Sequence, residues 1–207
     1  LIVEKFPKKT DSWGKQAYQR NYLLNGLDKS SLDDLIIYSD VDEIPNPKKI
    51  SDLKFERYAI FLQKCFYYKL NLINSKIGNS WEGSRICHRR DLKSFEELRN
   101  DIKIKYLNYP FWRMDKEKKI KIIHSGGWHF SYLMNAEKIK QKIKTFAHTE
   151  LDNNEFTNIE NINAAIREKK DLFNRSEYTN TLEKINLDES FPNYILNNIE
   201  KFKNWII

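Results

Sequence analysis

The sequence predicts an α/β protein in which helices flank a central mixed sheet, and three observations carry this prediction. Strand-like and helix-like segments alternate early in the chain, and the middle of the chain is rich in β-branched and aromatic residues. No repeat, linker or low-complexity tract divides the 207 residues. The composition, 40% hydrophobic and 14% aromatic, is that of a folded chain, and the length favours one domain over residues 1–207.

The elements of the first half follow from apolar runs and from the residues that cap or end them. A strand over residues 1–6 is closed by Pro7, and Asp11 or Ser12 caps a helix that runs through residues 16–24 and ends at Gly26. The later patterns predict a buried strand at 35–39, a short helix from Pro47 through Leu53, one or two strands within 58–73, a strand at 81–88 and a Ser94-capped helix to residue 100.

In the second half, lysine and isoleucine alternate over residues 119–124, as expected for a half-buried strand. Gly126-Gly127 is expected to break this strand, and a new one resumes over residues 128–133. Asn135 caps a helix through Phe146. Two more helices are expected over residues 159–169 and 194–205.

Charge and cysteine content restrict the class of partner. The formal net charge of +7 suits an anionic partner such as a nucleotide, a nucleic acid or an acidic membrane face. Cys65 and Cys87 lie in apolar surroundings without metal-type spacing, so packed free thiols are expected in place of a disulfide. We find no signal peptide, and no apolar run is long enough to span a membrane.

Two aspartates follow the apolar run of residues 35–39. On extended backbone, Asp40 and Asp42 project from the same face with Cα atoms about 6.5–7 Å apart, and Pro45 ends the strand. Both carboxylates would then reach one Mg²⁺ or Mn²⁺ ion, which leaves coordination positions for substrate phosphates. The alternative is that these acids, with Glu43, are solvated residues at the end of a strand.

A second cluster surrounds Gly126-Gly127. The glycine pair permits a close approach of backbone to a ligand, Trp128 offers a flat face suited to a sugar ring, and His129 offers a nitrogen ligand for Mn²⁺. The alternative is that Trp128 and its neighbouring aromatic residues belong to the core. By strand alternation, His129 faces away from Trp128.

Acid–base chemistry has candidates at the end of the next helix. Glu150 and Asp152 lie where a loop begins, and either of these carboxylates, or His148, could deprotonate an acceptor hydroxyl. Phosphate or sugar contacts are offered more weakly by Arg20, Asn21, Trp81 and Arg85. The chain contains no P-loop, no Gly-rich dinucleotide fingerprint and no Gly-x-Ser-x-Gly elbow, which removes the main support for kinase, NAD-enzyme and α/β-hydrolase readings.

Taken together, these segments resemble glycosyltransferase family 17, the family of the bisecting β-1,4-mannosyl-glycoprotein N-acetylglucosaminyltransferase and of many bacterial and viral relatives. The acidic core together with the Gly-Gly-Trp-His-Phe-Ser-Tyr run is the most specific part of the match. The matching pieces span nearly the whole chain: Trp13, Gln19-Arg20-Asn21, Leu35–Pro45, Phe66-Tyr67-Tyr68, Trp81-x-Gly83, Gly126–Tyr132, Lys142–Glu150 and Asp171-Leu172-Phe173-x-Arg175.

The resemblance implies a GT-A-like sandwich, a nucleotide-sugar donor and an inverting transfer to a glycan hydroxyl. It suggests UDP-N-acetylglucosamine as the donor and Mn²⁺ or Mg²⁺ as the cofactor. By this match Asp42 binds the cation directly, and Asp40 supports it or the donor ribose. We add His129 as a further metal ligand and Glu150, then Asp152, as the base. The remaining assignments are Arg20 and Asn21 to the donor, and Trp128, Trp81, Arg85 and His148 to the sugar or acceptor.

The chain also departs from the family pattern. Relatives have an earlier strand and loop before the segment that matches residues 1–6, and Lys15 and Gln16 replace acidic residues that are common in relatives. The similarity to bacterial and viral members implies a cytoplasmic enzyme, with a Golgi enzyme as the alternative. Two other functions stay open: a metal-dependent nuclease or phosphohydrolase, and a non-catalytic module that binds sugar or, through basic residues interleaved with aromatics at 106–113, nucleic acid.

Overall fold

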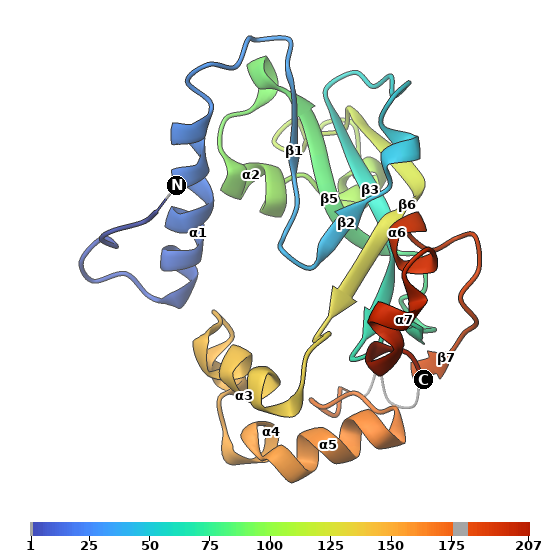
Figure 1. The fold of residues 1–207 in the computed structure, drawn as a ribbon. Coiled ribbons are helices and arrows are strands. Elements are labelled where there is room, and N and C mark those ends of the chain that lie inside the picture. The colour runs from blue at the N-terminus through green and yellow to red at the C-terminus, as the bar shows by residue number, and fades with distance from the viewer. Residues whose placement is uncertain (1, 176–181) are drawn as a thin grey trace. The chain divides into compact units, whose positions relative to one another are not determined.

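The computed structural model describes residues 2–175 and 182–207, which form two compact units (Figure 1). The first unit comprises Leu1–Gln63 and Glu82–Gly127, and the second comprises Lys64–Trp81 and Trp128–Ile207. Two long strands, β3 (Tyr58–Tyr67) and β6 (Ile120–Ser131), contribute residues to both units. Each unit therefore combines two separated stretches of sequence.

The sheet of the first unit begins at an edge strand. β1 (Leu35–Tyr38) pairs antiparallel with β5 (Trp81–His88), so that Tyr38 lies opposite Arg85. β5 pairs in turn with β3, and β6 pairs with both β3 and the short β2 (Glu43–Pro45). The residues of β1 alternate between exposed and buried, so one face of the strand meets solvent, which corrects the expectation of a fully buried strand.

The sheet is mixed, as predicted. The N–H of Tyr58 donates to the carbonyl of Lys119, and ten residues later the N–H of Tyr68 donates to the carbonyl of Ser131. Both bonds advance in the same direction along the two strands, so β3 and β6 run parallel, whereas β1 and β5 are antiparallel. The α/β class is therefore confirmed.

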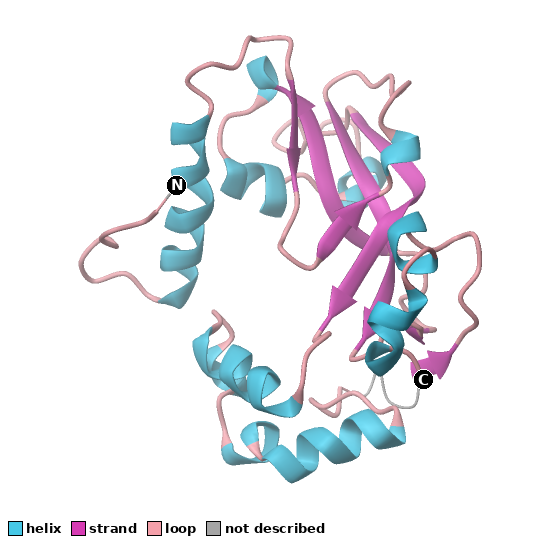
Figure 2. Cartoon of the chain, in the orientation of Figure 1, coloured by secondary structure: helices cyan, strands magenta, loops and turns pink. Residues whose placement is uncertain are grey.

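Two helices complete the first unit, and α2 lies between α1 and β1 (Figures 1 and 2). α1 (Ser12–Tyr22) is capped by Asp11, whose carboxylate accepts the N–H of Gly14. α2 (Phe95–Asn100) is capped by Ser94, whose hydroxyl accepts the N–H of Glu97. Both caps were predicted. The buried face of α2 joins a cluster of apolar side chains that includes Ile36, Tyr38, Tyr58, Ile60, Cys87, Phe95 and Leu98.

The second unit is mainly helical. Among its described residues, the strands besides the ends of β3, β5 and β6 are β4 (Leu72–Asn74) and β7 (Leu182–Lys184), which pair with each other. Ile139 and Ile143 of α3 and Ile162 of α5 are buried in one cluster with Tyr68. The helices are α3 (Ala136–Thr145), α4 (Asn154–Thr157), α5 (Ile159–Glu168), α6 (Asn193–Leu196) and α7 (Ile199–Phe202).

Short 3-10 turns occupy the connections. They lie at Leu23–Gly26, Pro47–Lys49, Arg89–Asp91, Ile104–Asn108, Thr149–Leu151 and Lys203–Trp205. Cys65 and Cys87 are buried free thiols, as expected. None of the described helices is both long and apolar enough to cross a bilayer.

Two predicted elements differ from the structure. Residues 2–6 form no strand, and Leu1 lies outside the described residues; Phe6 instead packs edge-on against Tyr18, with ring centroids 5.9 Å apart. The helix expected over 194–205 is divided into α6, α7 and a final 3-10 turn. Asn198 separates the two helices with φ −135° and ψ 36°, outside the helical region.

Gly126-Gly127 does not break the strand as expected, because β6 runs continuously from Ile120 to Ser131. The two glycines instead permit a close approach of other backbone. A Cβ on Gly127, whose φ is +144°, would lie 2.1 Å from the carbonyl oxygen of Ile44, and one on Gly126 would lie 2.8 Å from the Cα of Phe61. The N–H of Asn46 donates to the carbonyl of Gly126 at 2.7 Å, which holds β2 against β6.

Candidate functional site

Asp40 and Asp42 lie in the turn between β1 and β2, and not on extended backbone. β1 ends at Tyr38, and the N–H of Glu43 donates to the carbonyl of Asp40 at 2.9 Å, which closes a four-residue turn. Val41 is fully exposed at its tip, and Asp42 beside it is partly exposed. The expected same-face geometry of the two aspartates is therefore corrected: a tight turn sets their directions, and Pro45 belongs to β2.

Both carboxylate oxygens of Asp40 are engaged by neighbouring side chains. The Tyr38 hydroxyl donates to Oδ1 at 2.7 Å, and Nε of Arg99 donates to Oδ2 at 3.0 Å. Nη2 of Arg20 lies 3.7 Å from Oδ1. Burial, followed by the nearby Asp40 carboxylate, raises the pKa of Tyr38, so its hydroxyl stays protonated and able to donate. Asp40 is thus a fixed anchor of the turn.

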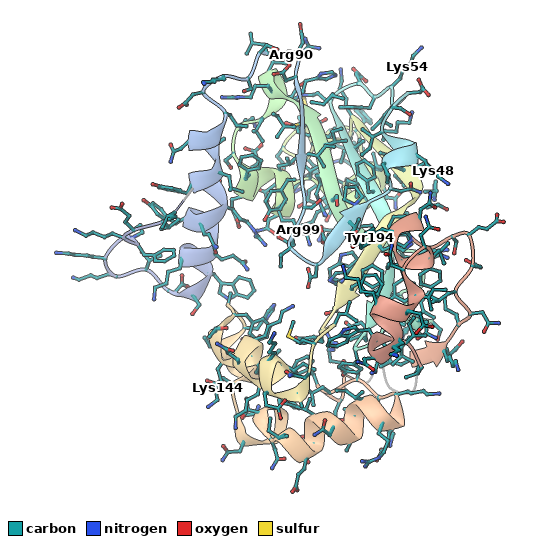
Figure 3. The ribbon with its side chains drawn as sticks, viewed as in Figure 1. Lys48, Lys54, Arg90, Arg99, Lys144 and Tyr194 are labelled. Atoms are coloured by element: carbon teal, nitrogen blue, oxygen red, sulfur yellow. The ribbon has the colours of Figure 1, made fainter. Side chains whose placement is uncertain are left out.

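Arg99 connects this turn to α2 (Figure 3). Its Nη2 donates to Oε1 of Glu43 at 2.9 Å, and its Nη1 donates to the carbonyl of Glu82 at 2.9 Å. The Glu43 side chain is only 1% exposed, and its second oxygen accepts the N–H of Asp40. One guanidinium therefore binds both acids that flank the turn, in the planar geometry that arginine provides.

Arg20, predicted as a donor-binding residue, does lie at this turn. Its Nε donates to the Tyr38 hydroxyl at 3.0 Å and its Nη1 to the Glu96 carboxylate at 3.0 Å. Burial alone would lower the pKa of Arg20, but Tyr38, Glu96 and Asp40 together raise it. The amide oxygen of Asn21 accepts the N–H of Glu96 and holds the first turn of α2, and its contact with the donor stays a prediction.

Arg85 is buried, which corrects its expected role in direct sugar contact. Its side chain is 3% exposed and donates to the main-chain carbonyls of Glu82 and Gly83. Burial, and then the nearby Arg99 charge, lower the pKa of Arg85 to about 10, so it remains a cation at neutral pH. A Cβ on Gly83 would lie 2.0 Å from Oε1 of Gln63, so the glycine makes room for the buried Gln63 amide.

The electrostatic balance of this network is negative. Three guanidinium groups face four carboxylates: Arg20, Arg85 and Arg99 against Asp40, Glu43, Glu82 and Glu96. An anionic diphosphate would be repelled by such a site unless a cation accompanied it. In the described part of the chain, no three His, Cys, Asp or Glu side chains are grouped to hold a metal ion. The carboxylates of the turn suit an ion that is bound by one protein carboxylate and completes its coordination with substrate phosphate and water. Mg²⁺ is commonly bound in this way.

The residues of the Gly-Gly-Trp-His run beyond the glycines belong to the second unit. His129 is buried, its ring stacks on Trp81 with centroids 4.2 Å apart, and its Nδ1 lies 3.6 Å from the Cys65 sulfur. Trp128 is buried with Phe66 and Phe130, and its indole N–H donates to the carbonyl of Ser190 at 2.9 Å. This packing corrects the expectation that Trp128 offers an open face to a sugar, whereas the metal role of His129 stays a prediction.

The predicted acid–base residues are solvent-accessible. Nδ1 of His148 lies 2.7 Å from the carboxylate of Glu150, and this hydrogen bond lowers the pKa of Glu150. Glu150 lies in the 3-10 turn that follows α3, and Asp152 comes directly after it with its side chain exposed. Their sequence-predicted position at a loop is confirmed; their role in catalysis stays a prediction.

Several members of the network were missed from the sequence. Tyr38, Arg99, Glu82 and Glu96 were not considered because nothing in their local patterns distinguishes them from ordinary strand or helix residues. Two signals were available in retrospect. Tyr38 comes two residues before Asp40, and Ser94 followed three residues later by Glu97 matches the capping-box pattern that starts the short helix α2, on which Arg99 lies.

A pocket of about 340 Å³ lies elsewhere on the first unit. It is formed by the 3-10 turn after β2 and the start of β6, and its lining is largely basic: Lys48, Lys49, Asp52, Leu53, Lys121, Ile122, Ile123 and His124. None of these residues belongs to the network around Asp40.

Comparison with protein families shows the family to which the chain belongs. The model of glycosyltransferase family 17 matches residues 2–206, nearly the whole sequence. The chain belongs to glycosyltransferase family 17. The resemblance based on the acidic turn and the Gly-Gly-Trp-His run is therefore confirmed, and so is the expectation of an enzyme that transfers a sugar, in a family of N-acetylglucosaminyltransferases. No curated protein and no solved structure gives a significant match to this family 17 chain.

Proposed function

We propose that this glycosyltransferase transfers N-acetylglucosamine from UDP-N-acetylglucosamine to a glycan hydroxyl, with inversion at the anomeric carbon and with a divalent cation, on a GT-A-like fold. The observation that carries the proposal is the fixed, net-negative network at the Asp40–Glu43 turn. Arg99 and Tyr38 engage Asp40, while Asp42 lies partly exposed beside the fully exposed Val41. A carboxylate in this place can bind a cation that accompanies a diphosphate.

The residues of the turn divide the work. Asp42 would hold Mn²⁺ or Mg²⁺, which would neutralise the departing diphosphate when bound. Asp40, whose oxygens already accept bonds from Tyr38 and Arg99, would hold the turn and approach the donor ribose. Arg99 keeps the buried Glu43 carboxylate compensated, so that the turn does not shift when a donor arrives.

The acceptor hydroxyl needs a base, and Glu150 is our first candidate. Its hydrogen bond with His148 lowers its pKa, so the carboxylate stays ionised over the range in which it must take a proton. In the transfer, the acceptor oxygen forms a bond to the anomeric carbon as the bond from that carbon to the diphosphate breaks, and the hydroxyl proton passes to the base. Asp152 is the second candidate.

Family membership favours sugar transfer over the two other functions considered. A nuclease or phosphohydrolase would use the same two aspartates to bind a metal ion that acts on a phosphodiester. A non-catalytic binding module would not need these aspartates for a reaction. No contact in the described residues favours either over transfer. If the purified protein cleaved nucleic acid and EDTA abolished the cleavage, this result would support a metal-dependent nuclease.

The decisive experiment measures donor binding and turnover with two matched variants. UDP-N-acetylglucosamine with Mn²⁺ should raise the melting temperature of the wild type, and UDP should be released in the presence of an acceptor glycan mixture. Asp42→Ala should abolish both effects. Asp28→Ala, which removes an exposed carboxylate in a loop of the same unit, should leave both unchanged.

Two outcomes would argue against the proposal. If no UDP-, GDP- or CMP-linked sugar shifts the melting temperature with any divalent cation, the donor site is absent. If the shift with UDP-N-acetylglucosamine persists in Asp42→Ala, the donor binds without the acidic turn.

A further inference from the structure

Three large apolar side chains are exposed on the loop of residues 110–118 in the first unit. Phe111 is 86% exposed, Trp112 67% and Met114 91%. Other exposed large apolar residues follow β1 and its flanking loops, but in the described chain no other three fall within four successive positions. Such a concentration is unfavourable in water and marks a surface that another phase or molecule covers.

Internal hydrogen bonds hold this loop in a defined conformation. The N–H of Arg113 donates to the carbonyl of Pro110 at 3.0 Å, and the N–H of Met114 donates to the carbonyl of Trp112 at 2.8 Å. These bonds close two overlapping turns, and within them Phe111 lies edge-on to Trp112 with ring centroids 5.2 Å apart. The loop therefore presents its apolar side chains in a defined arrangement.

Cations surround the base of this loop. Between residues 103 and 121 the chain carries seven lysines and arginines against Asp115 and Glu117. Asp115 is paired with Arg113 and lies 3.5 Å from Lys116, Lys119 is paired with Glu56, and Glu117 with Arg57, so the cations exceed the acids that they pair with. The ammonium group of Lys118 donates to the carbonyl of Pro110, and that of Lys116 lies over the Tyr106 ring at 5.1 Å. Positive charge is thus held directly beside the apolar tip.

We propose that the 110–118 loop binds the surface of a membrane that contains anionic lipids. Phe111, Trp112 and Met114 would enter the headgroup region, where aromatic side chains are favoured, and the surrounding lysines would contact the lipid phosphates. This combination fits a bilayer better than a single sugar ring, because three large exposed apolar side chains beside cations need both a continuous apolar medium and anionic groups. Each lysine near the surface adds attraction that salt weakens.

Vesicle sedimentation tests this assignment independently of sugar transfer. The wild type should bind vesicles of phosphatidylcholine and phosphatidylglycerol in a ratio of about two to one, and bind pure phosphatidylcholine much more weakly. Phe111→Ser/Trp112→Ser should reduce binding to the anionic vesicles about tenfold or more, since it removes two inserted side chains. Lys116→Glu/Lys118→Glu should also reduce it. Leu23→Ser/Leu32→Ser removes exposed apolar residues elsewhere in this unit and should bind like the wild type.

Fluorescence gives a second readout from the loop itself. The chain has five tryptophans, and lipids with brominated acyl chains should quench Trp112 alone among them. The quenching should disappear in Trp112→Phe, a variant that keeps an apolar side chain and should still sediment with vesicles.

The proposal is overturned if the wild type ignores anionic vesicles, or if Phe111→Ser/Trp112→Ser binds them as well as the wild type, because charge alone would then explain adsorption. Binding of single-stranded oligothymidylate that depends on Trp112, without vesicle binding, would assign the loop to nucleic acid instead. Unchanged melting temperatures of the variants exclude unfolding as the cause of any loss.

Discussion

Nη2 of Arg99 lies 2.9 Å from the carboxylate of Glu43, whose side chain is almost completely buried. Glu43 is enclosed, and its carboxylate accepts hydrogen bonds from this guanidinium and from the N–H of Asp40. Arg99 in turn reaches Asp40, so a single side chain of α2 holds both ends of the acidic turn.

Arg99→Ala should destabilise the protein by about 3 kcal/mol, since it removes the guanidinium that is hydrogen-bonded to the buried Glu43 carboxylate. Urea unfolding would measure the change. Lys93→Ala, which removes the exposed Lys93–Glu97 pair beside the same helix, should cost less than about 1 kcal/mol. Equal losses in the two variants would contradict the central role of Arg99.

The two aspartates should respond differently to substitution. Asp40→Asn weakens bonds from Tyr38 and Arg99 and should destabilise the protein by about 2 kcal/mol. Asp42→Asn should change stability by less than about 1 kcal/mol, as substitutions at partly exposed sites usually do. The variant should nevertheless lose the Mn²⁺-dependent response to UDP-N-acetylglucosamine. Calorimetric unfolding and donor titration separate the two effects. A large stability loss in Asp42→Asn would show that this residue is structural.

Gly127→Ala should destabilise the protein by about 3 kcal/mol, because the new methyl group would meet the carbonyl of Ile44 and displace β2. Gly78→Ala is the matched control. Gly78 also has a positive φ, but a Cβ there would lie no closer than 3.6 Å to other atoms, so only the conformational cost of about 1 kcal/mol applies. Similar costs at both glycines, measured by thermal unfolding, would show that the approach of β2 to β6 is not tight.

The thiol of Cys87 should make stability depend on alkaline pH. Burial, and then the Asp91 charge, raise the pKa of Cys87 from 9.0 to about 12. The folded protein therefore keeps this proton when the unfolded chain loses it, so the contribution to stability is complete below about pH 9 and falls as pH rises toward 12. The slope from this one group approaches about 1.4 kcal/mol per pH unit.

In Cys87→Ala, the free energy of unfolding should fall less steeply with rising pH than in the wild type. This holds whatever the substitution does to stability at neutral pH. The test measures the free energy of unfolding of both proteins from pH 8 upward, within the pH range in which they refold. Buried tyrosines also titrate at high pH, so the comparison rests on the difference in slope. Parallel curves would contradict a raised thiol pKa.

Local patterns were sufficient where a few neighbouring residues decide the structure. Ser94 and Asn135 cap helices as predicted, because each places a side-chain oxygen within reach of an N–H three residues later. The strand at Tyr58–Tyr67 follows from its β-branched and aromatic content. The motif around Asp40 and the Gly-Gly-Trp-His run identified the family, because they combine rare residue types in a set order.

Long-range contacts defeated the same reasoning elsewhere. Gly126-Gly127 was expected to break a strand and serve a ligand, but its space is filled by the backbone of Ile44–Asn46, far away in sequence. Trp128 was expected to face a sugar, but it packs with Phe66 and Phe191. Periodicity specifies which residues share a face of a strand, and it contains no information about what covers that face.

The sequence by itself determined the α/β class, most element positions, the family and the acidic turn as the place to look. Only the tertiary structure decided how that turn is held. Arg20 from α1, Arg99 from α2 and Arg85 from β5 come from three elements, and no local pattern relates them. The physical reason is that charge compensation acts through space over a few ångströms, whereas sequence patterns report only on neighbours along the chain.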